Sequence, residues 1–229
     1  MDYVFQFREV LRYWPWLVQG TAVTLALSVA AMALSLVTGT AGALARRSRY
    51  RVLRAAMATY VEVIRNTPFL VQLFILYFGL PTVGFRMSAM TAGLVGIVLY
   101  NTAFTTEIVR AGLQAIHRSQ VESGLSIGMS RAQVFFYVVI KPAIAKVYPA
   151  LASQFVLLML GTSVVSAIGV EELTSFAHQI QTINFRSIEV YIVIICIYMA
   201  MTLLLRAGFR GLHAAFFGFA RRPGLRDVR

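Results

Sequence analysis

The sequence predicts an all-α polytopic membrane protein with five transmembrane helices. Of its 229 residues, 59% are hydrophobic and only 13% are charged, too few charges to cover the surface of a soluble domain. Long uncharged runs recur along the chain, and most of them reach about 20 residues, the length of helix that crosses a bilayer. The basic residues are divided unevenly between the loops, and this asymmetry predicts how the chain is oriented.

The predicted spans lie in five uncharged runs, which are 17–45, 66–85, 87–106, 147–170 and 190–205. Residues 59–60 and their neighbours extend the second span backwards across Glu62 and Arg65. The first span is rich in Ala, Gly, Ser and Thr, small side chains that let helices approach each other closely. Because no linker, repeat or low-complexity tract interrupts the pattern, residues 1–229 are predicted to form a single transmembrane domain.

With five spans, one side of the membrane carries most of the 21 lysines and arginines. That side includes the turn 46–54, the segment 117–146 and the basic tail after Arg206. The positive-inside rule therefore places the N-terminus outside and the C-terminus in the cytoplasm. The net charge of +12 is explained by this topology, so no nucleic-acid partner is expected.

The outer segments are predicted to be short interfacial elements. Residues 1–16 form an amphipathic helix along the outer membrane surface, and their acidic residues argue against a cleavable signal peptide. The loop 171–187 is expected to hold a second short helix. Cys196 is the sole cysteine, so no intrachain disulfide can form, and we expect it to be a small core residue. The three histidines are scattered, and no metal site is expected.

The second span contains polar side chains whose presence needs an explanation, because burying a polar group in a bilayer costs free energy. Glu62 and Arg65 are three residues apart and can form an ion pair. Pro68 lacks a backbone N–H, so it should kink the helix and free a carbonyl group. Asn66 and Gln72 flank this kink, and two interpretations stay open: they line a polar substrate pathway, or the helix is merely bent.

A second group of polar side chains lies in the third and fourth spans. Asn101 belongs to the third span, and Thr162, Ser163 and Ser166 follow Gly161 in the fourth. A glycine beside hydroxyl groups can open a small cavity that accepts a zwitterion. Hydrogen bonding between helices explains each residue equally well when it is taken alone. Together the two spans favour a translocation pathway.

The segment 117–146 interrupts the apolar sequence between the third and fourth spans. Ser119 and Glu122 have the spacing of a capping box, Gly128 can end a helix in the left-handed conformation, and Ser130 with Gln133 can cap the next helix. The sequence therefore predicts two short helices joined at a glycine on the cytoplasmic side. Such an elbow suits docking by a protein outside the membrane.

Nothing in the chain indicates catalysis. It contains no G-x-x-x-x-G-K-[ST] motif, and its only lysines are Lys141 and Lys146, so we expect no ATP hydrolysis and no bound cofactor. No nucleophile and base have a catalytic spacing. A proton-driven carrier would place an acidic residue deeper in the membrane than Glu62 or Glu107, whose neighbour Arg110 can pair with it.

Several of these motifs resemble the permease subunits of bacterial ATP-binding-cassette importers, in the polar amino acid uptake group. In that family the loop reads Glu-Ala-Ala, three residues, Gly, about nine residues and Ile-x-Leu-Pro. Here Glu122-Ser123-Gly124 stands for the triplet, Gly128 falls at the required spacing, and Val138-Val139-Ile140 matches the apolar close. The proline of Lys141-Pro142 comes one position late. Similar segments are VEVIRNTPFLVQLFILYFGLP, EIVRAG and TSVVSAIGVEEL.

The resemblance implies a permease of the bacterial inner membrane that carries a polar amino acid or a derivative. Its partners would be a second permease, two cytoplasmic ATPases that bind ATP and Mg²⁺, and an external solute-binding protein. Carried over residue by residue, the ATPase-coupling set is Glu122, Ser123, Gly124 and Gly128. The pathway residues expected from the spans remain Asn101, Thr162, Ser163, Ser166, Asn66 and Gln72.

Three other classes of membrane protein fit the sequence less well than an importer permease. A secondary carrier driven by an ion gradient predicts inverted repeats with paired interrupted helices, which five spans do not provide. A scaffold without transport activity does not explain the polar residues within the spans. A channel would need a selectivity sequence or a ring of charge. The identity of the amino acid, and the choice between two identical and two related permeases, stay open.

Overall fold

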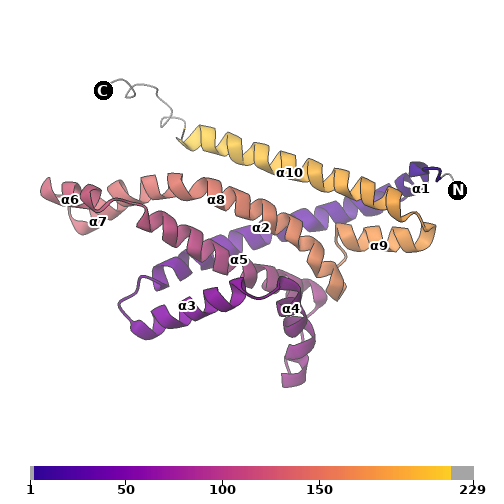
Figure 1. The fold of residues 1–229 in the computed structure, drawn as a ribbon, viewed down its shortest axis with the longest axis horizontal. Coiled ribbons are helices and arrows are strands. Elements are labelled where there is room, and N and C mark those ends of the chain that lie inside the picture. The colour runs from indigo at the N-terminus through magenta and orange to yellow at the C-terminus, as the bar shows by residue number, and fades with distance from the viewer. Residues whose placement is uncertain (1–2, 218–229) are drawn as a thin grey trace.

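The computed structural model describes residues 3–217, and every regular element in that range is helical (Figure 1). The α-helices, in chain order, are α1 Phe7–Leu11, α2 Trp14–Ala45, α3 Arg51–Arg65, α4 Phe69–Phe74, α5 Ala89–Gln114, α6 Arg118–Ser126, α7 Arg131–Gln133, α8 Ile140–Gly161, α9 Leu173–Asn184 and α10 Ser187–Phe217. Two π-helical segments, η1 Ile75–Gly79 and η3 Val134–Val139, and two 3₁₀ segments, η2 Leu80–Val83 and η4 Thr162–Ile168, extend these helices.

Four helices are long and apolar enough to cross a membrane: α2, α5, α8 with η4, and α10. A fifth span is formed if α3 and the segment Phe69–Val83 count as one, although they meet at an angle of 109°. The all-helical class is therefore confirmed, with four or five candidate spans. The turn predicted at 46–54 is shorter than expected, because α3 already begins at Arg51.

The break in the second span follows from Pro68. Proline has no N–H to continue the α3 ladder, and it pushes the residue before it out of the helical conformation, so α3 ends at Arg65 and α4 begins at Phe69. Gln72 satisfies the carbonyl groups left at the break, since its Nε2 lies 2.9 Å from the Ile64 oxygen and 3.1 Å from the Thr67 oxygen. The predicted kink is thus confirmed as a full break.

Glu62 and Arg65, in contrast, form no ion pair within the described residues, and that expectation was wrong. Both side chains are exposed, and the Arg65 guanidinium instead lies 5.3 Å from the centre of the Phe104 ring. The analogous pair on α5 does form: Arg110 binds Glu107 at 2.6 Å, and Arg46 approaches the same carboxylate to 3.5 Å.

The small residues of the first span bring α2 against α5. A Cβ atom added at Gly39 would lie only 2.5 Å from the Thr105 Cβ, so the two backbones meet without intervening side chains. The Thr38 and Thr102 hydroxyls are 2.6 Å apart, and the Thr106 hydroxyl donates to the Gly39 carbonyl at 3.2 Å. Close packing therefore replaces the hydrophobic drive that is absent between helices in lipid.

Helix α8 packs against α5 in a similar way. A Cβ at Gly112 would lie 1.9 Å from Val147, which fixes the crossing point of the two helices. Beside it, the Lys146 ammonium donates at 2.6 Å to the carbonyl of Ala115, the C-cap residue of α5. A cation at a helix C-terminus also complements the helix dipole. The end of α5 and the start of α8 are thus tied together.

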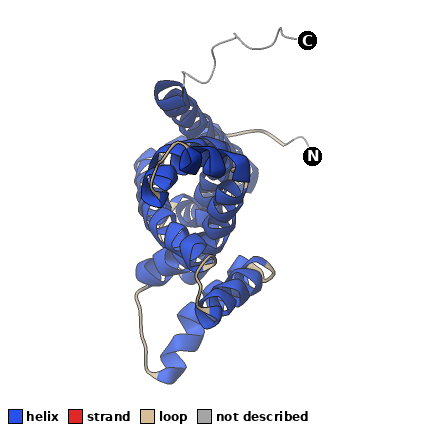
Figure 2. Cartoon of the chain, turned by 90° about the vertical axis from the view of Figure 1, so that its left-hand side faces the viewer, coloured by secondary structure: helices blue, strands red, loops and turns tan. Residues whose placement is uncertain are grey.

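The long helices run between two ends of an elongated molecule (Figure 1). The elbow end, as we call it, holds α6, α7 and the last turns of α10, and the opposite end holds α1 and α9. Seen close to the long axis, α3 and α4 lie to one side of the packed helices (Figure 2). Several large apolar side chains of this broken segment are exposed, among them Ile75 and Phe78.

A buried carboxylate fixes the opposite end. Glu172, whose side chain is fully buried, caps α9 by accepting from the Ser175 N–H at 2.9 Å and also accepts from the Tyr198 and Thr24 hydroxyls. Burial raises the pKa of the Glu172 carboxyl above its usual value, and the backbone and hydroxyl donors around the carboxyl offset only part of this rise. These bonds join α2, α9 and α10. The predicted helix in the loop 171–187 is present as α9.

The chain termini are described in part. The interfacial helix predicted over 1–16 is short: α1 covers Phe7–Leu11, and α2 already begins at Trp14. The Glu189 carboxylate holds the segment before α1, because the Tyr3 hydroxyl and the Gln6 N–H donate to it. Cys196 is exposed on α10 and is not the core residue that was expected. The basic tail beyond Phe217 lies outside the described residues.

Candidate coupling elbow and polar cavity

Helix α6 forms the first arm of the elbow. Its N-cap is His117, not Ser119, and no side chain caps the helix, so the capping box predicted from Ser119 and Glu122 was wrong. The reason is that α6 begins two residues earlier than a cap at Ser119 would require, which takes Ser119 into its first turn. The Glu122 carboxylate binds Arg118 at 2.9 Å instead, and both side chains are largely exposed.

Gly128 ends α6 as predicted. Its φ of 84° is left-handed, a conformation that costs glycine nothing and other residues about 1 kcal/mol or more. The Met129 N–H donates to the Gly124 carbonyl at 3.2 Å, and the Gly128 N–H donates to the Leu125 carbonyl at 3.0 Å. These two bonds are the Schellman pattern, which turns the chain sharply at the glycine.

The second arm begins with the capping box of Ser130 and Gln133, which is present as predicted. The Gln133 N–H donates to the Ser130 hydroxyl, and the Gln133 side chain accepts from the Ser130 N–H at 2.8 Å. This arm is not a separate short helix, however, because α7 continues through η3 into α8. Pro142 lies inside α8 and does not end the helix. The wide π turn just before it accommodates the missing N–H.

The residues that correspond to the family triplet, Glu122-Ser123-Gly124, differ in their exposure. Gly124 is buried, and an added Cβ would lie 2.9 Å from Val134, so glycine lets α6 rest directly on η3. Glu122 and Ser123 are exposed, together with the apolar Leu125 and Ile127, the last of which is 79% exposed. Helix α6 therefore packs against η3 through Gly124, and its opposite face, which is partly polar and partly apolar, is exposed.

A cavity of about 330 Å³ lies deeper, between α4, α5 and α8. The aromatic rings of Phe69, Tyr100 and Phe104 form one wall, with the Phe69 and Tyr100 ring centres 5.0 Å apart. Asn101 and Gln154 supply the polar groups, and the Gln154 Nε2 donates to the Asn101 Oδ1 at 2.9 Å. No ionised side chain lines this cavity among the described residues.

The predicted pathway residues are not brought together in that cavity. Of them only Asn101 lines it, although Gly161 beside the predicted hydroxyls does so too. The Thr162, Ser163 and Ser166 hydroxyls each donate to a backbone carbonyl three residues earlier, at 2.7–2.8 Å, within their own helical turn. Their hydroxyls thus stabilise the 3₁₀ segment η4 in this structure.

The residues near the kink lie in two other hollows. Asn66 lies beside Arg65 and Glu107 in a hollow of about 390 Å³, and Gln72 lies in a mostly apolar one of about 490 Å³. Three of the six candidates therefore lie in three separate hollows, and the other three, the hydroxyl-bearing residues, lie in η4. Their role in transport stays a prediction.

Two residues of these sites were not anticipated. Gln154 is a single amide in an apolar helix, four residues before Leu158 and eight before Thr162, and only the fold shows that it faces Asn101. Its intramembrane position was a usable signal, because an amide inside a bilayer is costly without a partner. Glu172 gave a similar signal, as an acidic residue at the end of the fourth span.

Comparison with known proteins decides the family. Residues 38–216 match the family of binding-protein-dependent transport system inner membrane components. The chain belongs to this ABC importer permease family. The glutamine transport system permease protein GlnP of Escherichia coli (strain K12) is 34% identical to this permease over 193 residues, covering 83% of this chain and 88% of GlnP. The probable glutamine ABC transporter permease protein GlnM of Bacillus subtilis (strain 168) is 34% identical over 185 residues, covering 81% and 86%.

Solved structures agree with the sequence comparison. A chain in a crystal structure of an amino acid ABC transporter with histidines superposes with a TM-score of 0.87 at 34% identity, covering 93% of this chain and 100% of that one. A chain of the MetNI methionine ABC transporter in an inward-facing conformation gives a TM-score of 0.71 at 19% identity, which shows the shared fold. The chain is therefore a multi-pass inner-membrane permease of an ABC importer, and the ion-driven carrier is not supported.

Proposed function

We propose that this permease carries a polar amino acid across the inner membrane and that α6 couples the transport path to a separate ATPase. The observation that carries the proposal is the position of α6. It is an exposed helix, held to its chain at Gly124, whose free face combines Glu122 and Ser123 with Leu125 and Ile127. A mixed surface of this kind suits a protein partner better than either lipid or water.

The packing below the elbow suggests how a push on α6 would be transmitted. Helix α6 rests on η3, which continues into α8, and α8 is tied to the end of α5 through Lys146 and Val147. A displacement of α6 would therefore tilt α5 and α8 together. Because Asn101 is on α5 and Gln154 is on α8, this tilt would change the polar cavity between them.

The cavity supports an amino acid with a neutral side chain as the substrate class. Its polar groups are two amides and one of its walls is aromatic. No ionised residue lines it within the described residues, so it offers no charge that would attract or repel a charged substrate side chain. The Gln154 Oε1 makes no hydrogen bond within the described residues and can accept from an ammonium or amide group. Two of the relatives given above are named for glutamine, and the solved neighbour is an amino acid transporter with histidines.

We further propose the assembly and orientation usual for such an importer. A second permease, the same or related, would complete the path, and two ATPases holding ATP and Mg²⁺ would dock at the elbow end. A solute-binding protein would meet the opposite end. The arginines at the elbow end, among them Arg47 and Arg51, support a cytoplasmic location for it, with the N-terminus outside. This permease itself would hydrolyse no ATP.

The decisive experiment is Glu122→Lys in the reconstituted transporter, with Gln120→Lys as the control. Gln120 is also exposed on α6 but lies on another side of the helix. Charge reversal at the docking surface should lower ATP-driven uptake by about tenfold or more, equivalent to about 1.4 kcal/mol of lost coupling. Membrane insertion should be unchanged, because the Arg118 pair is exposed and contributes little to stability.

Uptake and ATP hydrolysis are measured on the same proteoliposomes. Full uptake by the Glu122→Lys transporter with its ATPase still bound would refute the coupling role. Purified permease without the ATPase should show no hydrolysis above background, and activity in that sample would contradict the assignment of hydrolysis to a separate chain.

A further inference from the structure

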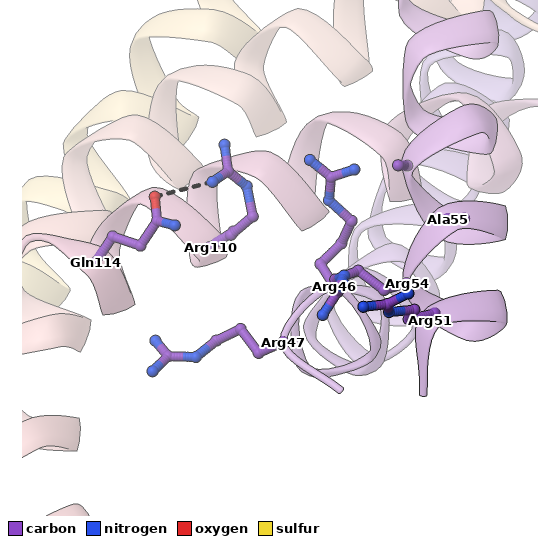
Figure 3. A pocket seen from close by; sticks show the side chains of 8 residues that line it. Arg46, Arg47, Arg51, Arg54, Ala55, Arg110 and Gln114 are labelled. Carbon is purple, nitrogen blue, oxygen red and sulfur yellow. Dashed lines mark hydrogen bonds between the residues drawn. The ribbon is translucent and has the colours of Figure 1, made fainter. Parts of the chain in front are cut away.

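A basic hollow lies at the elbow end, and none of its lining residues belongs to α6 or to the polar cavity. It has a volume of about 460 Å³ and lies between the end of α2, the start of α3 and the end of α5. Five arginines and a glutamine line it: Arg46, Arg47, Arg51, Arg54, Arg110 and Gln114. Figure 3 shows Arg110 and Gln114 on one side, Arg51 and Arg54 on the other, and Arg46 and Arg47 between them.

Within the described residues, the charge of these arginines is only partly neutralised. Glu107 pairs with Arg46 at 3.5 Å and with Arg110 at 2.6 Å, and the Arg110 side chain also donates to Gln114 at 2.8 Å. Arg47 and Arg51 form no ion pair or side-chain hydrogen bond within the described residues, and Arg54 reaches only the Ser48 carbonyl at 3.5 Å. Five cations with one shared carboxylate repel each other, so the hollow favours an anion.

The surface beside the hollow is apolar. On α2, Val37 is 71% exposed and Leu44, seven residues later on the same face, is 52% exposed. Arg47 follows three residues after Leu44. The exposed face of α2 is apolar up to its last turn, and basic residues follow directly after it. This order suits a ligand with a hydrocarbon tail and an anionic headgroup. An acidic soluble protein would match the arginines alone.

We propose that the basic hollow binds the phosphate headgroup of an anionic phospholipid, with its acyl chains along the exposed face of α2. Guanidinium groups suit this ligand, because their planar donors bind phosphate oxygens in pairs. The lipid would neutralise the surplus arginines and join the turn 46–50 to the end of α5, next to the elbow. The inference needs only that α2 spans the membrane, so it stands or falls independently of the role of Glu122.

The test uses the purified full-length permease in mixed micelles of phosphatidylglycerol and phosphatidylcholine. The variant is Arg47→Gln with Arg51→Gln, which removes two charges and breaks no hydrogen bond or ion pair within the described residues. The matched control is Arg206→Gln with Arg210→Gln, which removes two exposed charges from α10 near the same end. Retained lipid is extracted after washing and quantified by mass spectrometry.

We expect the variant to retain roughly 25-fold less phosphatidylglycerol, about fivefold for each charge removed, with phosphatidylcholine unchanged. The control should retain phosphatidylglycerol like the wild type. Equal retention by wild type and variant, or an equal loss in the control, would overturn a specific lipid site.

Two further arms separate the lipid from other anions. Excess inorganic phosphate should leave the bound phosphatidylglycerol in place, whereas its displacement would identify a site for free phosphate and overturn the proposal. Co-purification of the cognate ATPase should be the same for wild type and variant. Loss of the ATPase with unchanged lipid retention would identify the hollow as a protein-docking surface and would likewise overturn the lipid assignment.

Discussion

Asn101 and Gln154 place a complementary amide pair inside an otherwise apolar and aromatic cavity. Asn101 is almost fully buried, and its oxygen is already engaged by the Gln154 side chain at 2.9 Å. A substrate amide or ammonium could exchange with this bond at little cost, because one hydrogen bond replaces another. A pair of neutral groups can therefore recognise a polar solute without a fixed charge in the membrane.

This arrangement predicts a coupled loss of transport. Asn101→Ala and Gln154→Ala should each lower uptake of a neutral polar amino acid by about tenfold, and the double variant should lose little more, since the two amides act as one unit. Thr40→Val is the control, because the Thr40 hydroxyl donates to the Leu36 carbonyl of its own helix and Thr40 does not line the cavity. Uptake of radiolabelled amino acid by proteoliposomes measures the effect. Independent, additive losses would count against a shared site.

Gly124 shows how one missing side chain positions a docking helix. An alanine there should push α6 off η3 and cost about 1–3 kcal/mol, since its Cβ would lie 2.9 Å from Val134. We expect faster hydrogen exchange in α6 and reduced uptake. Ser123→Ala, at an exposed neighbouring position, should leave hydrogen exchange unchanged. An unaltered exchange rate in Gly124→Ala would mean that α6 does not depend on this contact.

Among the elements, the elbow is held by two different devices at its hinge. The Schellman bonds around Gly128 end α6, and the capping box of Ser130 and Gln133 starts the next helix two residues later. Because α7, η3 and α8 are continuous, rotation at Gly128 changes the angle between the two arms of the elbow without unwinding a helix. The arm that follows it is a rigid extension of the fourth span.

The hinge predicts a local cost for a side chain at residue 128. Gly128→Ala should destabilise the elbow by about 1 kcal/mol, because alanine adopts the left-handed conformation poorly. Gly211→Ala is matched to it, since Gly211 is helical with open space around its Cβ position and should tolerate alanine. Hydrogen exchange of α6 in the purified permease distinguishes the two. Equal protection in both variants would show that the left-handed conformation is dispensable.

At the scale of the whole molecule, the long helices run from the elbow end to the opposite end, so each end can meet a different side of the membrane. The basic hollow and the elbow share one end, while α9 and the Glu172 network hold the other (Figure 1). The broken pair of α3 and α4 lies beside the packed helices (Figure 2), with exposed apolar side chains that a second permease could cover. These exposed side chains support the proposal that a second permease completes the pathway.

Accessibility labelling tests the proposed orientation. In a Cys196→Ser background, Phe185→Cys should react with a membrane-impermeant thiol reagent in spheroplasts, and Ser126→Cys should react only in inside-out vesicles. Both positions are exposed, residue 185 before α10 and residue 126 on α6. Reaction of both from the same side would refute the proposed topology, since α8 and η4 must cross the membrane between them.

The sequence was sufficient for the features that depend on local chemistry. Hydropathy located the spans, and Pro68 located the break in the second span. Gly128 predicted the end of α6, and Ser130 with Gln133 predicted the cap of the next helix. Each of these features depends on residues within one or two turns. The motif around Glu122 was sufficient for the family. The cap at Ser119 was predicted wrongly although it is local, because α6 starts two residues earlier and Ser119 therefore lies inside the helix.

Contacts between distant segments could not be read in the same way. The Glu62–Arg65 pair was inferred from spacing along one helix, and the pathway hydroxyls and the core position of Cys196 were inferred from residue type. The surroundings of all these side chains depend instead on how the helices pack. Gln154 meets Asn101 across 53 residues, and arginines from three helices meet in one hollow. Periodicity states which face a residue occupies on its own helix. Which face meets which neighbour depends on close approaches such as Gly112 against Val147, and these exist only once the helices have packed.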